Sequence, residues 1–368
     1  MFKKVYIKNF RGIKELVIEP LNKVNIFVGD NMAAKTSILD ALFIAINPND
    51  LLLAFRTNKF RNIDYMPDLS QILAFFNYMD IRNKIIIKLS GIKKNRNIEI
   101  YPRFKSSRSV TYATPIDLDK KNELSFKDND VISSTENIDN KDNIIGLESI
   151  FEINGVEYKS SLELLPNAVV ETKGDEKFRR EIKGRYVNTI TSNTGNLCEA
   201  YSKVVENKKK EDILKFLKNF NTKIKDINLV SISRNNILLL EVDEFDKAID
   251  INYFGTGLTR ALYIYLSFLS GDDIVLIDEI ENGLFFSRQK KMWETIREII
   301  KNKNNNQYFI TTHSADMIKN LYEVAVKYNF IDSISLFRIE KINEINQSIY
   351  YSKDQFKNAI NLGLETRG

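Results

Sequence analysis

The stretch that most constrains the fold is "VNIFVGDNMAAKTSILDALFIA" at residues 24–45, which predicts a strand, a loop and a helix. The apolar run "VNIFV" predicts a buried strand, and a helix follows from Lys35 to about Ile46, stopped by Asn47-Pro48. Gly29 and the pair Lys35-Thr36 fit the pattern G-x-x-x-x-G-K-[ST], but Ala34 stands where that pattern has its second glycine. The segment therefore predicts one β–loop–α unit of a layered α/β fold.

The loop has the chemistry of a phosphate cradle. Successive backbone N–H groups in such a loop point inward, and the dipole of the following helix favours negative charge. Lys35 would reach the β- and γ-phosphates of a nucleotide, and Thr36 would ligate Mg²⁺. Because Ala34 directly precedes the helix, we expect its methyl group to be a small intrusion. An ordinary β–turn–α unit is the alternative interpretation of the loop, which comprises Gly29, Asp30, Asn31, Met32, Ala33, Ala34, Lys35, Thr36 and Ser37.

A second signal is the acidic pair that ends the apolar run in "DDIVLIDEIENGL". Ile274 to Ile277 predict a short buried parallel strand, and Asp278-Glu279 follow at its carboxyl end. An aspartate placed there can hold Mg²⁺, directly or through water. The adjacent glutamate can orient and deprotonate an attacking water. An acidic pair with no function is the alternative for this segment.

A third signal is "QYFITTHSADM", which contains His313, the only histidine of the chain. His313 follows a second predicted buried strand and precedes a helix that Ser314 is placed to cap. A histidine at that position could sense a γ-phosphate through a hydrogen bond. The three signals in this order predict nucleotide binding, with ATP and Mg²⁺ as the expected ligands.

Composition fits an ordinary globular protein and excludes several classes. Of the 368 residues, 43% are hydrophobic and 28% are charged, enough apolar side chains to bury a large core. The single cysteine, Cys198, excludes an internal disulfide framework. The longest apolar stretches fall short of a membrane span, and the N-terminus lacks a signal-peptide pattern, so we expect a cytoplasmic protein with no membrane partner.

The remaining chain predicts a mixed pattern of elements. Strands are expected at 2–10, 13–20, within 84–103, at 148–159, 167–172, 308–311, 332–340 and 346–351, and helices at 196–220, 258–269, 287–301, 314–328 and 354–365. Residues 105–147 are polar and predict a long surface excursion. We expect an α/β core built from residues 1–55 and 251–368, with residues 56–250 inserted as a β and helical lobe. The pattern predicts no long coiled coil.

These motifs resemble the ABC-type ATPase heads of the SMC, Rad50 and RecF group. They are similar in particular to the short prokaryotic AAA family ATPases related to the OLD proteins, labelled AAA15 or AAA21. "VYIKNFRGIKELVIEPLNKVNIFVGDN" resembles the start of that group, "LIDEIENGLFFSRQKKMWETI" its Walker B and D-loop, and "FITTHSADMI" its switch-histidine segment. The resemblance covers residues 1–47 and about 250–368.

The resemblance implies a role for each matching residue. It assigns Asp278 to Mg²⁺, Glu279 to the catalytic base and His313 to the γ-phosphate, and it places Arg11 near the phosphates. In this group ATP lies between two heads, so a homodimer or higher homo-oligomer is implied. The segment matching the signature of the opposite head is "NYFGTGLTRAL", with Gly255, Thr256 and Gly257 at a helix start. Gln71 is a candidate for the Q-loop by position alone.

The resemblance leaves three functions open. The favoured one is an ATPase that dimerises on ATP and controls a separate effector, such as a nuclease or toxin, in prokaryotic phage defence. The second is a RecF-like DNA-binding repair clamp, and the third is a nucleotide-binding scaffold with little turnover. We expect Ala34 to slow turnover or weaken binding. Too few residues follow His313 for the TOPRIM nuclease domain of the OLD proteins, so no nuclease chemistry is expected in this chain.

Nucleic acid is a further candidate partner. Two stretches are basic, "KFRREIKGR" at 177–185 and "NKKKEDILKFLK" at 207–218. Both also contain acidic residues, so a solvated helix face is the alternative for each. The net charge of +5 is too small to decide between these interpretations.

Overall fold

A six-stranded sheet forms the centre of the computed structural model, which describes residues 1–59, 61, 68–92, 94–105, 143–165, 169–188, 193–232, 235–284, 286–302 and 305–361. The strand order is β16-β15-β3-β14-β13-β9, and all neighbours are parallel except the edge pair β15 and β16. Strands β3, β13 and β14 read as short, mostly apolar runs because both of their faces are covered. The strands are β3 Val24–Val28, β9 Gly184–Val187, β13 Ile274–Ile277, β14 Gln307–Thr311, β15 Ile334–Ile342 and β16 Ile345–Tyr351.

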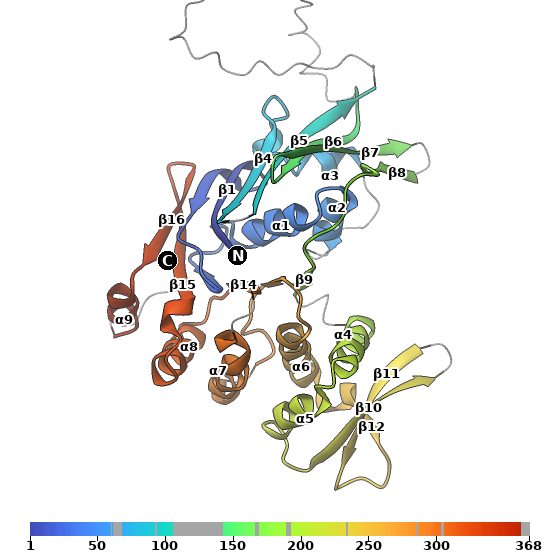
Figure 1. Cartoon of the computed structure of the whole chain (residues 1–368), viewed down its shortest axis with the longest axis vertical. Helices are drawn as coiled ribbons and strands as arrows, with labels where there is room; N and C mark the ends of the chain where they lie inside the picture. The colour runs from blue at the N-terminus through green and yellow to red at the C-terminus, as the bar shows by residue number, and fades with distance from the viewer. Residues whose placement is uncertain are drawn as a thin grey trace, which may run out of the picture.

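A seven-stranded antiparallel sheet, in the order β2-β1-β4-β5-β6-β7-β8, covers one side of the central layer (Figure 1). Helix α1, Lys35–Ile46, lies between the two sheets, which explains why ten of its twelve residues are buried. The strands are β1 Phe2–Phe10, β2 Ile13–Ile18, β4 Ile85–Gly91, β5 Asn95–Phe104, β6 Ile144–Ile153, β7 Val156–Leu165 and β8 Val169–Lys173. The short helices α2 Leu52–Lys59, α3 Leu69–Leu73 and η1 Asn77–Met79 complete this side.

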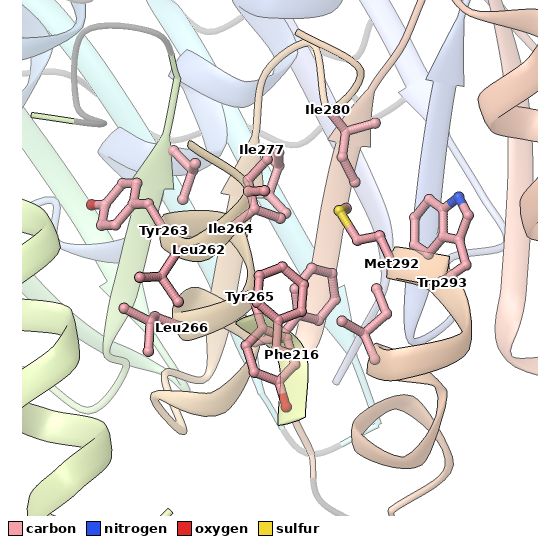
Figure 2. Packing of buried hydrophobic residues seen from close by; sticks show 14 of the residues in the cluster. Phe216, Leu262, Tyr263, Ile264, Tyr265, Leu266, Ile277, Ile280, Met292 and Trp293 are labelled. Atoms are coloured by element: carbon pink, nitrogen blue, oxygen red, sulfur yellow. The ribbon is translucent and has the colours of Figure 1, made fainter. Parts of the chain in front are cut away.

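Helices cover the opposite face of the central sheet. Alternation along β14 sends Phe309 toward α1 and sends Tyr308 and Ile310 into the helical layer. Figure 2 shows α6 side chains packed between Phe216 of α5, Ile277 of β13 and Trp293 of α7. The elements here are α4 Thr194–Glu206, α5 Lys210–Lys218, β10 Ile224–Ile232, β11 Asn235–Val242, β12 Ile249–Asp250, η4 Ile251–Phe254, α6 Thr256–Leu269, α7 Phe286–Lys301, α8 Ala315–Lys327, η5 Ile331–Ser333 and α9 Lys353–Asn361.

The α/β class is confirmed, and several expected elements need correction. The expected helix 196–220 is two helices, because Lys208 adopts a positive φ of 59° between α4 and α5. The expected strand 148–159 spans the turn of the β6–β7 hairpin, at Asn154 and Gly155. The polar excursion ends before β6 starts at Ile144, and residues 106–142 of it lie outside the described residues, as do residues 362–365 of the final helix.

The sheets do not follow the expected boundary between core and inserted lobe. Strands β4 to β8 continue the sheet that β1 and β2 begin, and β9 pairs with β13 in the central sheet. The longest described helix is α7, with 16 residues, so no coiled-coil arm occurs in the part of the chain that the structure describes. None of the described helices is long and apolar enough to cross a membrane.

Gln307 at the start of β14 joins the chain's first strand to the central sheet. Its side-chain amide accepts a hydrogen bond from the Phe2 N–H at 2.9 Å and donates to the carbonyl oxygens of Phe2 at 2.8 Å and Asn22 at 2.9 Å. Gln307 is 1% exposed, so water does not replace these bonds. The side chain acts as an additional peptide group between β1 and β14.

We predict that Gln307→Leu lowers the free energy of unfolding by about 3 kcal/mol, because a buried N–H and two carbonyl groups lose their partner. Chemical denaturation measures this change. Gln347→Leu on the exposed side of β16 is the matched control and should stay within about 0.5 kcal/mol of the wild type. Equal losses in the two variants would contradict the role given to Gln307.

Candidate functional site

Three carboxyl ends of parallel strands meet at one edge of the central sheet. Because β14 lies between β3 and β13, the loop after Val28, the pair Asp278-Glu279 and the segment Thr311–His313 are neighbours. Open parallel sheets place their ligands at this edge. A cavity of about 620 Å³ opens here, lined by Arg11, Gly12, Asn31, Met32, Ala34, Lys35, Thr36, Ser37, Arg61, Ala74, Phe76, Tyr78, Met79, Asp278, Glu279, Thr311 and His313.

The loop after β3 is held in a conformation that its sequence explains in part. Gly29 has φ 133°, and a Cβ there would lie 2.1 Å from the Ile339 carbonyl oxygen, so this position requires glycine. Ala34 caps α1 with φ 72° and ψ 22°, in the left-handed region. Ala34 directly precedes the helix, as expected, but the expectation of a small intrusion did not include this positive φ. The position does favour glycine, and the alanine holds an unfavourable backbone conformation.

Lys35 folds back over the loop. Its ammonium group donates to the carbonyl oxygens of Gly29 and Asp30, at 2.7 Å each. Burial lowers the pKa of Lys35 below its ordinary value, although the carboxylates of Asp278 and Asp30 act in the opposite direction. A partly desolvated ammonium group at a helix N-terminus has the charge and the donors that a phosphate group would need.

Thr36 and Asp278 meet across the cavity. The Thr36 hydroxyl lies 3.3 Å from both carboxylate oxygens of Asp278, and the Thr311 hydroxyl donates to one of them at 2.6 Å. Burial raises the pKa of Asp278 to about 6, with further contributions from the like charges of Asp40 and Glu279. A desolvated carboxylate beside a hydroxyl fits a hard cation such as Mg²⁺, whose other ligands would be waters and phosphate oxygens. Across the described residues, no group of three or more His, Cys, Asp or Glu side chains could hold a metal ion.

The turn after β13 presents Glu279 to the cavity. Glu279 adopts a positive φ of 51°, and its backbone N–H donates to the Thr311 hydroxyl at 2.8 Å. The Arg260 guanidinium of α6 donates to the carbonyl oxygens of Asp278 at 2.9 Å and Glu279 at 3.0 Å, which fixes this conformation. The Asn282 side chain donates to the Glu279 carboxylate. Glu279 is thus oriented by its neighbours and borders the same cavity as Thr36.

His313 also lines the cavity, at the end of β14. Its backbone N–H donates to the Glu281 carboxylate at 2.7 Å, which ties the β14 end to the β13 turn. Ser314 caps α8 by accepting from the Met317 N–H at 3.1 Å, as the sequence predicted. The structure therefore brings together the Lys35-Thr36 pair, the acidic pair and the histidine.

Of the other predicted residues, some line the cavity and others lie away from it. Asp30, Asn31 and Met32 are exposed on the loop, whereas Ala33 and Ser37 are buried, and Asn31, Met32 and Ser37 line the cavity. Gly255, Thr256 and Gly257 do not line the cavity. They begin α6 on the surface, where a Cβ at Gly257 would lie 2.5 Å from the Gly283 carbonyl oxygen.

Arg11 borders the cavity, but its guanidinium group is directed into the protein. It donates to the side chains of Thr57 at 2.6 Å and Asn58 at 2.7 Å, and it pairs with Asp40 at 3.5 Å. Gln71 is buried and accepts from the Asn58 side chain at 3.2 Å, so it supports this network from behind and does not line the cavity.

Sequence reasoning missed two groups of cavity residues. Arg61 pairs with Asp40 at 2.7 Å and also donates to Ser37, next to the loop. Tyr78 and Met79 both adopt positive φ values, 53° and 57°, and are exposed at the cavity rim. Lys341 donates to the Tyr78 hydroxyl at 3.1 Å and so ties the rim to β15. No sequence motif marks these residues, although aromatic side chains at a rim can stack on a nucleobase.

We predict that Ala34→Gly leaves nucleotide binding intact, changes turnover by no more than about tenfold and stabilises the fold by up to about 1 kcal/mol. Glycine relieves the left-handed strain at Ala34 but loses more chain entropy on folding. Ala34→Val should cost about 2 kcal/mol or more, because a β-branched residue resists a positive φ. Denaturation curves of both variants test this. A loss above about 1 kcal/mol in Ala34→Gly would show that the packing of the Ala34 methyl group matters more than the strain.

We predict a pH-dependent stability of the ligand-free protein that depends on Asp278. The folded protein holds this proton up to about pH 6, whereas the unfolded chain releases it near its ordinary value of 3.8. The folded state binds more protons between these values, so its contribution to the free energy of unfolding falls by about 3 kcal/mol as pH rises through that window. Asp278→Asn should lack this decrease and be more stable than the wild type above pH 6. Parallel stability curves for the two proteins would refute the assignment.

Comparisons with known proteins agree with this geometry. Residues 155–318 match the family model described as "AAA ATPase domain", and residues 1–94 match a family described as a protein of unknown function, DUF2813. An "ATP/GTP phosphatase" of Helicobacter pylori is 26% identical over 98% of this chain and 100% of its own length. The "DNA replication and repair protein RecF" of Pseudoalteromonas translucida is 40% identical over 57 residues, 16% of this chain and 15% of that protein.

Among solved structures, an SMC head bound to the C-winged helix domain of ScpA aligns at a TM-score of 0.48 and 11% identity. The alignment covers 96% of this chain and 99% of that one. The domain match and the full-length relative both name nucleotide-hydrolysing proteins, and the converging strand ends fit such a site. Residues 155–318 are thus similar to the AAA ATPase domain, and the chain as a whole is similar to the ATP/GTP phosphatase.

Proposed function

We propose that this protein binds ATP with Mg²⁺ in the 620 Å³ cavity and hydrolyses it to ADP and phosphate. One observation supports this above the others: Thr36, which follows the loop lysine, lies 3.3 Å from both carboxylate oxygens of Asp278, a residue 242 positions away in the chain. A hydroxyl and a buried carboxylate at the end of a phosphate-type loop are the protein ligands that nucleotide-bound Mg²⁺ uses in this class of site. Thr36 and Asp278 would hold Mg²⁺, and the bound ion would supply positive charge that neutralises charge developing on the phosphates.

The residues of the cavity then have separate tasks. Lys35 donates to the β- and γ-phosphates, and the N–H groups at the start of α1 bind the remaining phosphate oxygens. Glu279, held by Asn282 and by the turn that Arg260 fixes, accepts a proton from the attacking water. His313 donates a hydrogen bond to the γ-phosphate. Arg61, which also lines the cavity, adds positive charge beside Ser37.

We further propose that two copies assemble on ATP. Gly255 and Thr256 are exposed at the start of α6 and do not reach the cavity of their own chain, and the neighbouring Tyr253 is 85% exposed. The start of a 14-residue helix offers N–H groups to an anion, so this surface could complete the site of a second copy. In this arrangement γ-phosphate hydrolysis would release the two copies.

The assembled dimer is proposed to control a separate effector protein, such as a nuclease or toxin, in antiviral defence. The support for this step is the resemblance of the sequence motifs to the OLD-related ATPases. The dimer would present a surface to its effector only while ATP remains intact, so the rate of hydrolysis would set how long the effector stays bound.

We predict that Lys35→Ala weakens ATP binding by at least about 100-fold, because the main cation for the phosphates is removed. Glu279→Gln should keep binding and lower kcat by about 10²- to 10⁴-fold, because the amide cannot accept a proton. Calorimetry measures binding, phosphate release measures turnover, and light scattering measures mass. With Mg²⁺ and ATP, Glu279→Gln should be a dimer and Lys35→Ala a monomer.

The same two variants test the effector. A second protein that co-purifies with Glu279→Gln from native cells, and is absent with Lys35→Ala, would support control of an effector. Equal turnover of wild type and Glu279→Gln would remove Glu279 from the base role. Full ATP affinity in Lys35→Ala would refute the proposed site as a whole.

A further inference from the structure

A second cavity, of about 600 Å³, lies beside the edge strand β9. Helices α1, α2, α4 and α6 form its walls together with residues 180–186 and with Asp272, which follows α6. The buried side chains of Tyr186, Tyr263 and Asp272 line its interior. It has the size of a small-molecule site, which ordinarily occupies about 300–1,000 Å³. The nucleotide site described above uses none of these residues.

The lining is strongly basic. Two acidic residues, Glu199 and Asp272, are outnumbered by five basic ones: Arg56, Arg180, Lys183, Arg185 and Lys203. The cavity therefore has a net formal charge of +3, although the whole chain of 368 residues has only +5. Like charges repel one another when they are brought together, so such a concentration indicates an anionic ligand.

Ion pairs within the cavity neutralise two of the five positive charges. Arg185 pairs with Asp272 at 2.7 Å, and Lys203 pairs with Glu199 at 2.7 Å. Within the described ranges, the side chains of Arg56 and Lys183 have no ion-pair partner, and Arg180 donates through Nε to the Ile182 carbonyl oxygen at 3.0 Å. The excess charge thus belongs to three exposed cations around a partly buried, aromatic-walled cavity.

The structure also separates the two basic stretches that the sequence could not distinguish. Arg180, Lys183 and Arg185 of the stretch 177–185 all line this cavity. In the stretch 207–218, Ile213, Phe216 and Leu217 are buried, whereas Lys215 and Lys218 are on the solvent face of α5. The second stretch is therefore the solvated helix face, and the first contributes to a concave site.

We propose that this second cavity binds the phosphate groups of an anionic ligand, at a site distinct from the nucleotide pocket. Guanidinium and ammonium groups bind phosphate oxygens through charge-assisted hydrogen bonds, and Arg56, Arg180 and Lys183 provide three such groups. The phosphates could belong to a small phosphorylated molecule or to a nucleic-acid strand that enters the cavity. The proposal concerns binding alone and does not depend on ATP hydrolysis.

The test uses the full chain with Lys35→Ala, so that phosphates no longer bind strongly at the nucleotide pocket. Inorganic tripolyphosphate and a short single-stranded oligonucleotide are titrated separately into this protein and into the same protein with Arg180→Gln and Lys183→Gln. We expect the added substitutions to weaken binding by about tenfold or more. For an oligonucleotide, the slope of log affinity against log salt should fall by about 1.4, or roughly 0.7 for each removed contact.

Lys215→Gln with Lys218→Gln is the matched control, since it removes the same charge from exposed positions of α5. Binding of tripolyphosphate that depends on Arg180 and Lys183 would identify a small phosphorylated ligand, and dependence seen for the oligonucleotide alone would identify a nucleic-acid strand. Equal losses in the control, or no loss in the Arg180 and Lys183 variant for either probe, would overturn the proposal. A thermal unfolding midpoint equal to that of the parent confirms that each variant is folded.

Discussion

The carboxylate of Asp40 is the group on which the arrangement around α1 depends. It is fully buried, and three side chains from other elements converge on it: Arg61 at 2.7 Å, Arg11 at 3.5 Å and the Tyr186 hydroxyl at 3.2 Å. A buried carboxylate costs several kcal/mol unless it is paired, and loss of one partner leaves that cost uncompensated. Asp40 therefore fixes the β1–β2 turn, the segment after α2 and strand β9 against the helix that follows the phosphate-type loop.

The cavity in front of this network is built from strained backbone. Arg11, Met32, Ala34 and Glu279 all have positive φ values and all border the cavity, although none of them is glycine. Each such residue costs of order 1–3 kcal/mol and persists where surrounding contacts determine its conformation. Those contacts are present, since Arg260 holds the carbonyl oxygens of the Glu279 turn and Gly29 packs against Ile339. Strain concentrated at one cavity is typical of a site that binds or reacts.

The sequence predicted the central strands and the residues at their ends better than it predicted the other residues that border the cavity. Strand β3, the acidic pair after β13 and the cap at Ser314 are local patterns of apolar periodicity and capping, and all three were confirmed. Strand β9 has four residues with no distinctive pattern, and only its pairing with β13 makes it part of the core. Arg61 and Tyr78 are set by contacts with Asp40 and Lys341, each more than 20 residues distant in the chain, and no local pattern encodes such contacts.

Asp40 also connects the electrostatics of the two cavities. On one side its negative charge contributes to the raised pKa of Asp278, which makes a cation beside Asp278 more favourable. On the other side it accepts a hydrogen bond from the Tyr186 hydroxyl, and Tyr186 also lines the second, basic cavity. The same carboxylate holds Arg61 at the edge of the first cavity. Direct contacts through Asp40 therefore link Tyr186 of the second cavity to Arg61 of the first, and loss of the Tyr186 hydrogen bond would leave Asp40 with only Arg61 and Arg11 as its charged partners.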